Sequence, residues 1–410
     1  MAIGLAENQG YLLVSKEDAV TTLSPAGTYK PPVAGDAVQI LSDGLEFTPA
    51  QEIIDRDIRS ATIEQTVGRT TTRSITGSVP CELRANSVEG GAPEADKLYE
   101  SLFGGKRQRT SKTLKTASSQ TGVSNRKRTF AVAAGDTSEF KPGDPVRIFK
   151  TAPDAIDFVS VIKSVNSTTN QVTLYNDAPI DIPGAADISP CTTYFVNPNQ
   201  NARFLSLTQF LGAKLEERAI GCRGTTGELS NFTTGQLPMF NFGFEGLDFA
   251  RSVPTPQQLT AANALATYQD SLPPIILGAK VFQDDVELTL NNVSINLTNT
   301  LGWITSTASE RGRLTGRVTD FDCTFTMNPY QDDDNVRSFD LFRQNNSFSV
   351  VGYAANKAVD GKLIQICTFC MPNCRVQEIA TGSEDGILTD ELSGRAFLTN
   401  GNDTIYLGFM

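Results

Sequence analysis

The chain has 410 residues, of which 39% are hydrophobic and 20% are charged, and its formal net charge is −11. A chain this long exceeds what a single hydrophobic core usually serves, so we expect more than one globular domain. Histidine is absent, which excludes catalytic triads that need it and removes the commonest metal ligand. The acidic charge argues against a dedicated nucleic-acid clamp, because such proteins present cations to phosphates.

The first residues lack the basic and apolar regions of a secretory signal, and no run of about 18 uncharged apolar residues occurs in the chain. We therefore expect a soluble protein that is made in a cytoplasm. The seven cysteines are odd in number and irregularly spaced. They are predicted to be reduced, buried thiols and not a disulfide framework.

Threonine, serine, asparagine, glycine and valine recur throughout, whereas runs of helix formers at helical spacing are scarce. This pattern favours a mainly β fold. Apolar and polar residues alternate within residues 36 to 83 and predict strands around one long hairpin or loop. Residues 93 to 105 begin with proline and acidic residues and end with two glycines, which predicts a short amphipathic helix.

No acidic residue occurs from position 101 to position 134, where basic residues stand among serine and threonine. This stretch is predicted to be an exposed, mobile basic arm. It has no aromatic residues between positions 104 and 129 for stacking on bases. In an acidic chain we interpret it as a contact with an acidic neighbouring subunit. Its candidate residues are Lys106, Arg107, Arg109, Lys112, Lys115, Arg126, Lys127 and Arg128.

Short strands with closely spaced turns predict a small β-barrel-like module at about residues 129 to 180. Residues 190 to 248 return to a strand pattern, and a stretch rich in Pro, Gln and Ala at 252 to 274 is typical of a linker. We interpret the chain as a discontinuous first domain (1–105 and 190–250), an insertion with the basic arm and module (106–189), a linker (251–275) and a second domain (276–410).

The pattern of the first domain recurs in the second. Thr76-Gly77 resembles Thr315-Gly316, and Leu102-Phe103 at the end of the predicted helix resembles Leu341-Phe342, both 239 residues apart (315 − 76 = 239; 341 − 102 = 239). One constant offset joins a strand motif to a helix end, so we interpret the fold as a duplicated β domain with one short helix per copy.

Three further patterns have alternative interpretations. Cys367, Cys370 and Cys374 resemble a zinc knuckle, but they lack an evident fourth ligand, and the first two would face opposite sides of a strand. Residues 332 to 335 are three aspartates followed by an asparagine, and they suit a hard cation or a helix start. Asp320 and Asp322 share a strand face, as paired carboxylates or as solvated side chains. We favour the structural interpretation of each and predict no catalytic residue, cofactor or metal site.

The order of elements resembles the major tail tube proteins of siphophages, which have long non-contractile tails, including the Chi-like group of flagellum-seeking phages. The resemblance rests on Tyr11-Leu-Leu-Val14, a long loop at residues 48 to 70, the segment from Thr76 to Leu83, the helix ending Leu102-Phe-Gly104, and the strands at 221–229 and 240–246. It covers most of the chain outside the basic arm and the small module.

The resemblance implies a structural virion protein, not an enzyme, that is assembled in the bacterial host and polymerises as stacked rings into the tail tube through which DNA is ejected. Two tube domains per chain imply a ring of three chains with pseudo-six-fold symmetry, with a hexameric ring as the alternative. Implied partners are further copies of the chain and the tape measure, tail terminator and distal tail proteins. DNA passes the lumen without specific binding, and the small module decorates the outside.

Within the long loop, Glu52, Asp55, Asp57 and Glu64 are candidate carboxylates that face the lumen or the next ring. Two other functions are compatible with a β-rich acidic chain. One is a head–tail connector or capsid decoration protein, and the other is a carbohydrate-binding β-sandwich protein.

Overall fold

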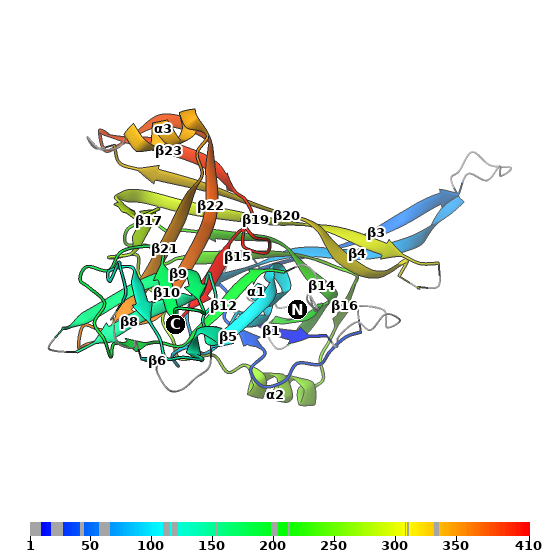
Figure 1. The fold of residues 1–410 in the computed structure, drawn as a ribbon. Helices are drawn as coiled ribbons and strands as arrows, with labels where there is room; N and C mark the ends of the chain where they lie inside the picture. The colour runs from blue at the N-terminus through cyan, green and yellow to red at the C-terminus, as the bar shows by residue number, and fades with distance from the viewer. Residues whose placement is uncertain are drawn as a thin grey trace.

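The computed structural model describes residues 10–17, 28–41, 45–56, 66–109, 115–116, 122–151, 154–197, 204–211, 214–307, 309, 311–331 and 336–410. The protein is mainly β, as predicted. Its α-helices within these ranges are α1 (Asp96–Phe103), α2 (Pro256–Leu265) and α3 (Val336–Gln344) (Figure 1). The helix predicted at residues 93 to 105 is α1, which ends at Gly104 with a positive φ of 77° that glycine adopts without strain.

Eight antiparallel strand segments form one continuous sheet, which we call the long sheet. Its order is β3-β4-β15-β14-β19-β20-β23-β22, and β14 and β22 join it through their C-terminal halves. The strands are β3 (Glu46–Arg56), β4 (Thr66–Glu82), β15 (Met239–Gly246), β14 (Leu215–Ser230), β19 (Leu290–Thr305), β20 (Arg313–Pro329), β23 (Ile387–Ala396) and β22 (Leu363–Glu384).

The N-terminal halves of β14 and β22 belong to two outer sheets. The first outer sheet has the order β2-β1-β13-β14-β16. The second has the order β18-β17-β21-β22-β24-β12-β5. Their further strands are β1 (Gly10–Lys16), β2 (Ala37–Val38), β5 (Gly104–Arg109), β12 (Cys191–Val196), β13 (Leu205–Leu211), β16 (Asp248–Ser252), β17 (Lys280–Gln283), β18 (Val286–Leu288), β21 (Phe348–Lys357) and β24 (Tyr406–Phe409).

The same order of strand pairings occurs twice along the chain. In each half a two-strand pair precedes a long hairpin and a helix, and a strand then pairs back on the first pair and leads into a long strand shared by both sheets. The irregularities also correspond, because β14 has a bulge at Thr225 and β22 has one at Gln377. Aligning the two bulges places two Cys-Arg dipeptides at equivalent positions, Cys222-Arg223 and Cys374-Arg375.

The strand register differs from the one that the sequence suggested. Phe47 pairs with Gly77 as Ile295 pairs with Phe325, so the two hairpins are 248 residues apart (295 − 47 = 248). The offset of 239 is therefore wrong for the strands, and Thr76 corresponds to Thr324. Different lengths of chain between the hairpin and the helix in the two halves account for the difference.

A single large core lies between the long sheet and the outer sheets, and both halves of the chain contribute to it. The ring of Tyr99 in α1 packs edge-on against that of Phe240 of the first half, with 4.9 Å between ring centroids. The centroid of the Phe409 ring of the second half lies 5.4 Å from that of Tyr99. Burial of one large apolar side chain contributes roughly 1.5–3 kcal/mol. The two halves are therefore stabilised together and not as independent bodies.

The chain between β5 and β12 folds as a second sheet with its own core, and we call it the inserted module. The predicted small β-barrel-like region lies within it. Its strand order is β6-β11-β8-β9-β10-β7, where the strands are β6 (Lys115–Thr116), β7 (Thr129–Ala131), β8 (Pro145–Lys150), β9 (Ile156–Asn166), β10 (Gln171–Leu174) and β11 (Asp187–Ile188).

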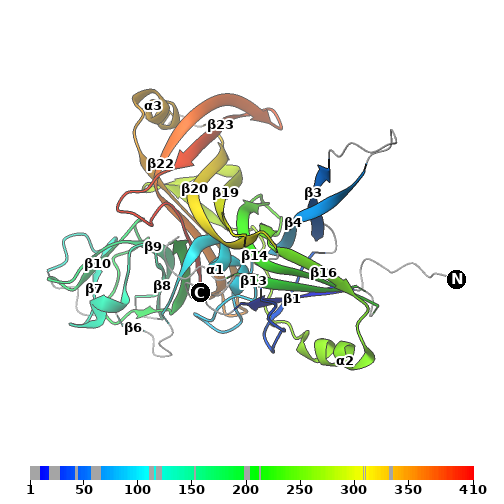
Figure 2. The ribbon, with the colours of Figure 1, turned by 90° about the vertical axis from the view of Figure 1, so that its right-hand side faces the viewer.

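The inserted module packs on the outer sheet of the second half, although it interrupts the first half. Val159 of β9 is buried in one cluster with Tyr353 and Ile366, and Val161 in another with Val351 and Tyr406. Figures 1 and 2 place the inserted module and the strands β3 and β4 toward opposite sides of the molecule.

Helix α2 covers the outer sheet of the first half, in the stretch predicted as a linker. Thr255 begins it with a capping box completed by Gln258. Ala262 is buried against Leu13 and Phe210 of β1 and β13. The region thus holds a packed helix as well as connecting chain.

Candidate assembly surfaces

The long sheet has one face on the core and one polar face. Val79, Phe242 and Leu297 are among its buried core-facing residues. Cross-strand pairing places the alternate residues on the opposite face, and one continuous row runs through Glu46, Ser78, Gly243, Thr226, Thr298 and Asp322. Strand geometry therefore presents a broad polar surface across eight strand segments.

Carboxylates predominate among the charged residues of this polar face. Asp322 forms an ion pair of 2.5 Å with Arg395, which lies on the same face. The described carboxylates that the pairing assigns to the face include Glu46, Glu82, Glu228, Glu245, Asp320, Asp322, Glu378 and Glu391, and its arginines include Arg317, Arg375 and Arg395. The face therefore carries a negative potential toward anything that lies over it.

The four carboxylates predicted from the sequence lie on or near the β3–β4 hairpin. Glu52 is exposed on β3 and accepts a hydrogen bond from the hydroxyl of Thr72. Asp55 is also on β3, but its side chain is not described, and Asp57 and Glu64 lie outside the described residues. The predicted long loop is mostly a paired hairpin, on which Ile53 and Ile54 are 64% and 60% exposed.

The prediction of an exposed mobile arm is wrong for its first residues. Lys106, Arg107 and Arg109 lie on β5, which pairs with β12 in the second outer sheet. Lys106 pairs with Asp96 at 2.6 Å. Arg109 is buried and donates to the Ser189 carbonyl at 2.7 Å. Local carboxylates and carbonyls contact these cations within the chain, which composition alone does not reveal.

The remaining basic residues are distributed over the inserted module. Lys115 lies on β6, paired with β11, and Lys112 is outside the described residues. Arg126 and Lys127 are exposed in the turn before β7. Arg128 forms ion pairs with Asp177 of the module at 2.7 Å and with Asp285 of the second half at 2.6 Å. It therefore connects the module to the surface beneath.

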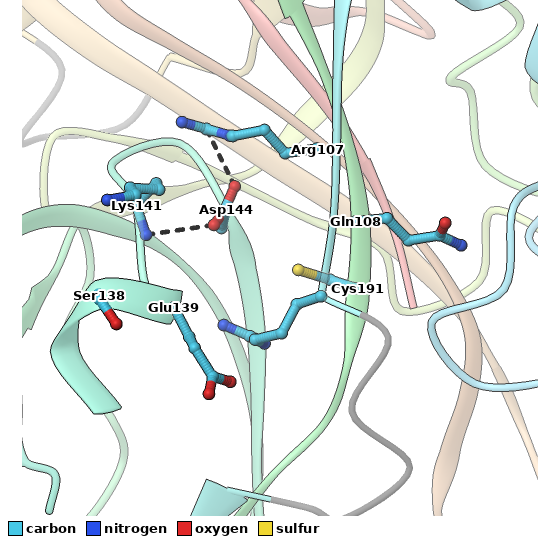
Figure 3. A pocket seen from close by; sticks show the side chains of 8 residues that line it. Arg107, Gln108, Ser138, Glu139, Lys141, Asp144 and Cys191 are labelled. Atoms are coloured by element: carbon cyan, nitrogen blue, oxygen red, sulfur yellow. Dashed lines mark hydrogen bonds and ion pairs between the residues drawn. The ribbon is translucent and has the colours of Figure 1, made fainter. Parts of the chain in front are cut away.

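A cavity of about 460 Å³ lies between β5 and the module (Figure 3). Arg107 and Asp144 both line it and form an ion pair of 2.9 Å with each other. Burial raises the pKa of Asp144, while Arg107 and Arg109 oppose that rise. Burial also raises the pKa of the Cys191 thiol to about 11, so the thiol stays protonated at neutral pH and is a poor nucleophile.

All seven cysteines are free and buried, as predicted. Cys367 and Cys370 lie on β22 and pack in different apolar clusters, so they do not converge. Among the residues that the structure describes, no group of three or more Cys, Asp or Glu residues is placed to hold a metal ion. Residues 332 to 335 lie outside the described part.

The two halves meet inside the chain at the pairing of β14 with β19, which we call the internal junction. Thr226 pairs with Thr298 there, and Leu229 with Ile295. Asn299 of β19 reaches back and donates to the carbonyls of Leu102 at 2.8 Å and Gly224 at 3.0 Å.

Arg223 supports the junction from the other side. It is buried on β14 and donates to the carbonyl of Gly316 at 3.1 Å. Burial lowers its pKa to about 10, so it remains charged at neutral pH. Asn299 and Arg223 thus connect the first half to the hairpin of the second through hydrogen bonds to backbone carbonyls. These bonds do not depend on which side chains the partner strand carries.

The sequence model of the phage tail tube protein family matches residues 7–396. The chain is a phage tail tube protein. No curated protein has a significantly similar sequence. A tail tube protein is a structural component of the virion tail that assembles with itself, and the β-rich sandwich with its long hairpin agrees with that role. None of the described helices has the length and apolarity needed to cross a membrane.

Sequence reasoning missed the residues that position this tail tube protein's junction. Asn299 and Arg223 stand in strand patterns like any polar residue of a β protein, and only the pairing of β14 with β19 shows that they are buried. The repeated Cys-Arg dipeptide at 222–223 and 374–375 was the available signal.

Proposed function

We propose that the chain carries the tube domain twice and that three copies form a closed ring of pseudo-six-fold symmetry, stacked axially into the tail tube. It acts there as a non-enzymatic structural subunit. The observation that carries this proposal is the recurrence of the strand pairing, including the bulges at Thr225 and Gln377. Heterologous contacts that close around an axis give rings, and those that do not close along it give an open polymer.

The repeated pairing favours a revised division of the chain. In this proposal the first tube domain comprises residues 10–103 and 204–252, and the second comprises residues 280–410. The insertion is wider than residues 106 to 189, because β5 and β12 pair into the sheet of the second half. Insertions are tolerated at exposed connections that leave the host pairing intact.

We place the polar face of the long sheet on the bore of the tube. Its opposite face is already covered by the core, and its carboxylates repel DNA phosphates, which lets the genome slide without sticking. The whole ring carries a formal charge of −33 (3 × −11 = −33). The inserted module then lies outside, where Arg126 and Lys127 remain candidates for contact with neighbouring subunits or other tail proteins.

Electron microscopy of the purified protein tests the stoichiometry. We expect tubes or stacked rings whose class averages have three-fold symmetry with six similar lobes. Strict six-fold averages, with six chains per ring by mass measurement of single rings, would contradict the three-chain ring. Particles that never stack would contradict the tube itself.

Glu228→Lys tests the lumen assignment. Glu228 lies in the middle of the polar face, and the change replaces one negative charge with one positive charge per chain where DNA would pass. We expect tubes of normal appearance that retain short DNA in a salt-dependent way, and phage that eject DNA poorly. The control is Glu287→Lys on β18 of the outer sheet, where Glu287 forms an ion pair with Lys280. Equal DNA retention by both variants would contradict the assignment.

A further inference from the structure

Two strand edges of the chain have one partner where their equivalents have two. Within the described residues, β3 pairs only with β4, and the C-terminal half of β22 pairs only with β23. In the other copy of the pairing, β19 and the C-terminal half of β14 each have a second partner, because they pair with each other. The internal junction therefore shows that each of the two open edges, on β3 and on β22, lacks a second partner strand.

The equivalence between the copies is fixed residue by residue. The hairpins correspond at an offset of 248, and their bulges coincide, because Ile53 pairs with Thr70 as Leu301 pairs with Val318. The long strands correspond at an offset of 152, set by the bulges of β14 and β22 (377 − 225 = 152). Both offsets come from pairings within each copy and not from the junction.

We propose that β22 of one chain pairs with β3 of the next in the register of the internal junction. Thr226 opposite Thr298 becomes Glu378 opposite Ala50 of the neighbouring copy. Glu228 opposite Asn296 becomes Ala380 opposite Thr48. The inference rests on the proposed ring and names which residues close it.

Side chains at the equivalent positions agree with this register. Asn299, which is buried at the internal junction, corresponds to Gln51, another amide, and Gln51 is exposed on β3. The buried Arg223 corresponds to Arg375, which is exposed on β22. In the junction each side chain donates to a backbone carbonyl of the other copy. Gln51 and Arg375 are therefore the side chains that would donate hydrogen bonds to backbone carbonyls of a neighbouring chain.

The helix next to the open edge has uncovered apolar surface. In α1, Leu98, Leu102 and Phe103 are at most 2% exposed. In α3, which packs beside β22, Phe339 and Phe342 are 52% and 36% exposed. A second copy seated on the β22 edge lies beside these rings, as the second half of the chain lies beside α1.

Paired cysteine substitutions test the register in assembled tubes. Ala50→Cys with Glu378→Cys places two thiols opposite each other on the exposed polar face, and Thr48→Cys with Ala380→Cys does the same one pair further on. The seven native cysteines are buried and give little background. After mild oxidation we expect a denaturing gel without reductant to show covalent dimers and then trimers, and no larger species.

The matched control is Glu46→Cys with Glu378→Cys. Glu46 lies on the same face, four residues from Ala50, a separation of about 13 Å along a strand. This exceeds the reach of a disulfide, whose Cβ atoms lie about 3.5–4.5 Å apart, so no cross-link is expected.

Three results would each decide a different point. Tubes in which the control pair links and the two predicted pairs do not would overturn the register and leave the tube function standing. Covalent species larger than a trimer from the predicted pairs would support the register and overturn the three-chain ring. An unmodified chain that forms no rings or tubes would overturn the proposed function itself.

Discussion

Replacing Asn299 with alanine is expected to lower the free energy of unfolding by about 2–6 kcal/mol, because two buried carbonyls lose their donor and each unsatisfied group costs about 1–3 kcal/mol. One of them, the Leu102 carbonyl, lies in the last turn of α1, where no intrahelical partner exists. The other belongs to Gly224 on β14. Denaturant unfolding of the unassembled chain, followed by circular dichroism, measures the change.

Asn296→Ala is the matched control for this prediction. Asn296 lies three residues earlier on β19 and is exposed on the polar face, so its loss is expected to change stability by less than about 0.5 kcal/mol. If both variants unfold at the same denaturant concentration, the amide of Asn299 does not hold the two halves together. A loss in Asn299→Ala alone supports the junction as an energetic link between the halves.

The class of fold followed from the sequence because strand patterns are local. Alternating residues around Val79 and the Pro-led, glycine-ended helix at α1 are set by neighbours in the chain, and the structure confirms both. The repeat was detectable for the same reason. Its register was not, because Thr315-Gly316 resembles Thr76-Gly77 by composition while the pairing aligns Thr324 with Thr76.

The candidate surfaces were harder to predict because they depend on distant pairings. The sequence shows that Lys106 and Arg107 are charged, but it does not show their carboxylate partners. Lys106 pairs with Asp96, and Arg107 pairs with Asp144, which lies in another part of the insertion. The carboxylates of the polar face, such as Glu228 and Asp322, come from both halves of the chain. Only the continuous order of the long sheet brings them to one side.

The contact between the inserted module and the second half is expected to fail in Val159→Asp. Val159 is fully buried against Tyr353 and Ile366, so the new carboxylate loses its water. Its cross-strand neighbour Arg147 is already paired with Asp157 and Glu89, so the carboxylate gains no cation of its own. Leaving a charge unpaired in such a site costs about 3–5 kcal/mol. We expect the module to separate from the outer sheet, which proteolysis of the linking chain and a lower unfolding midpoint would report.

The pH dependence of the stability of Val159→Asp distinguishes the cost of burying a charge from the cost of changed packing. Burial raises the pKa of the introduced carboxylate above its unfolded value near 4. The folded state then binds the proton more tightly than the unfolded state, so stability falls as pH rises from about 4 toward the raised pKa. The destabilisation of Val159→Asp is therefore expected to be larger at pH 7 than at pH 4, whereas that of Val159→Asn, whose side chain is isosteric with Asp, is expected to be similar at both.

The control variant is Ser164→Asp, at an exposed position of the same strand, and it is expected to leave the unfolding midpoint unchanged. If Val159→Asp unfolds like Ser164→Asp at pH 7, the module does not depend on this contact. Its place on the second half would then be held by the apolar cluster around Val161, the ion pair of Arg128 with Asp285 and the hydrogen bond from the Leu363 amide to Asp157.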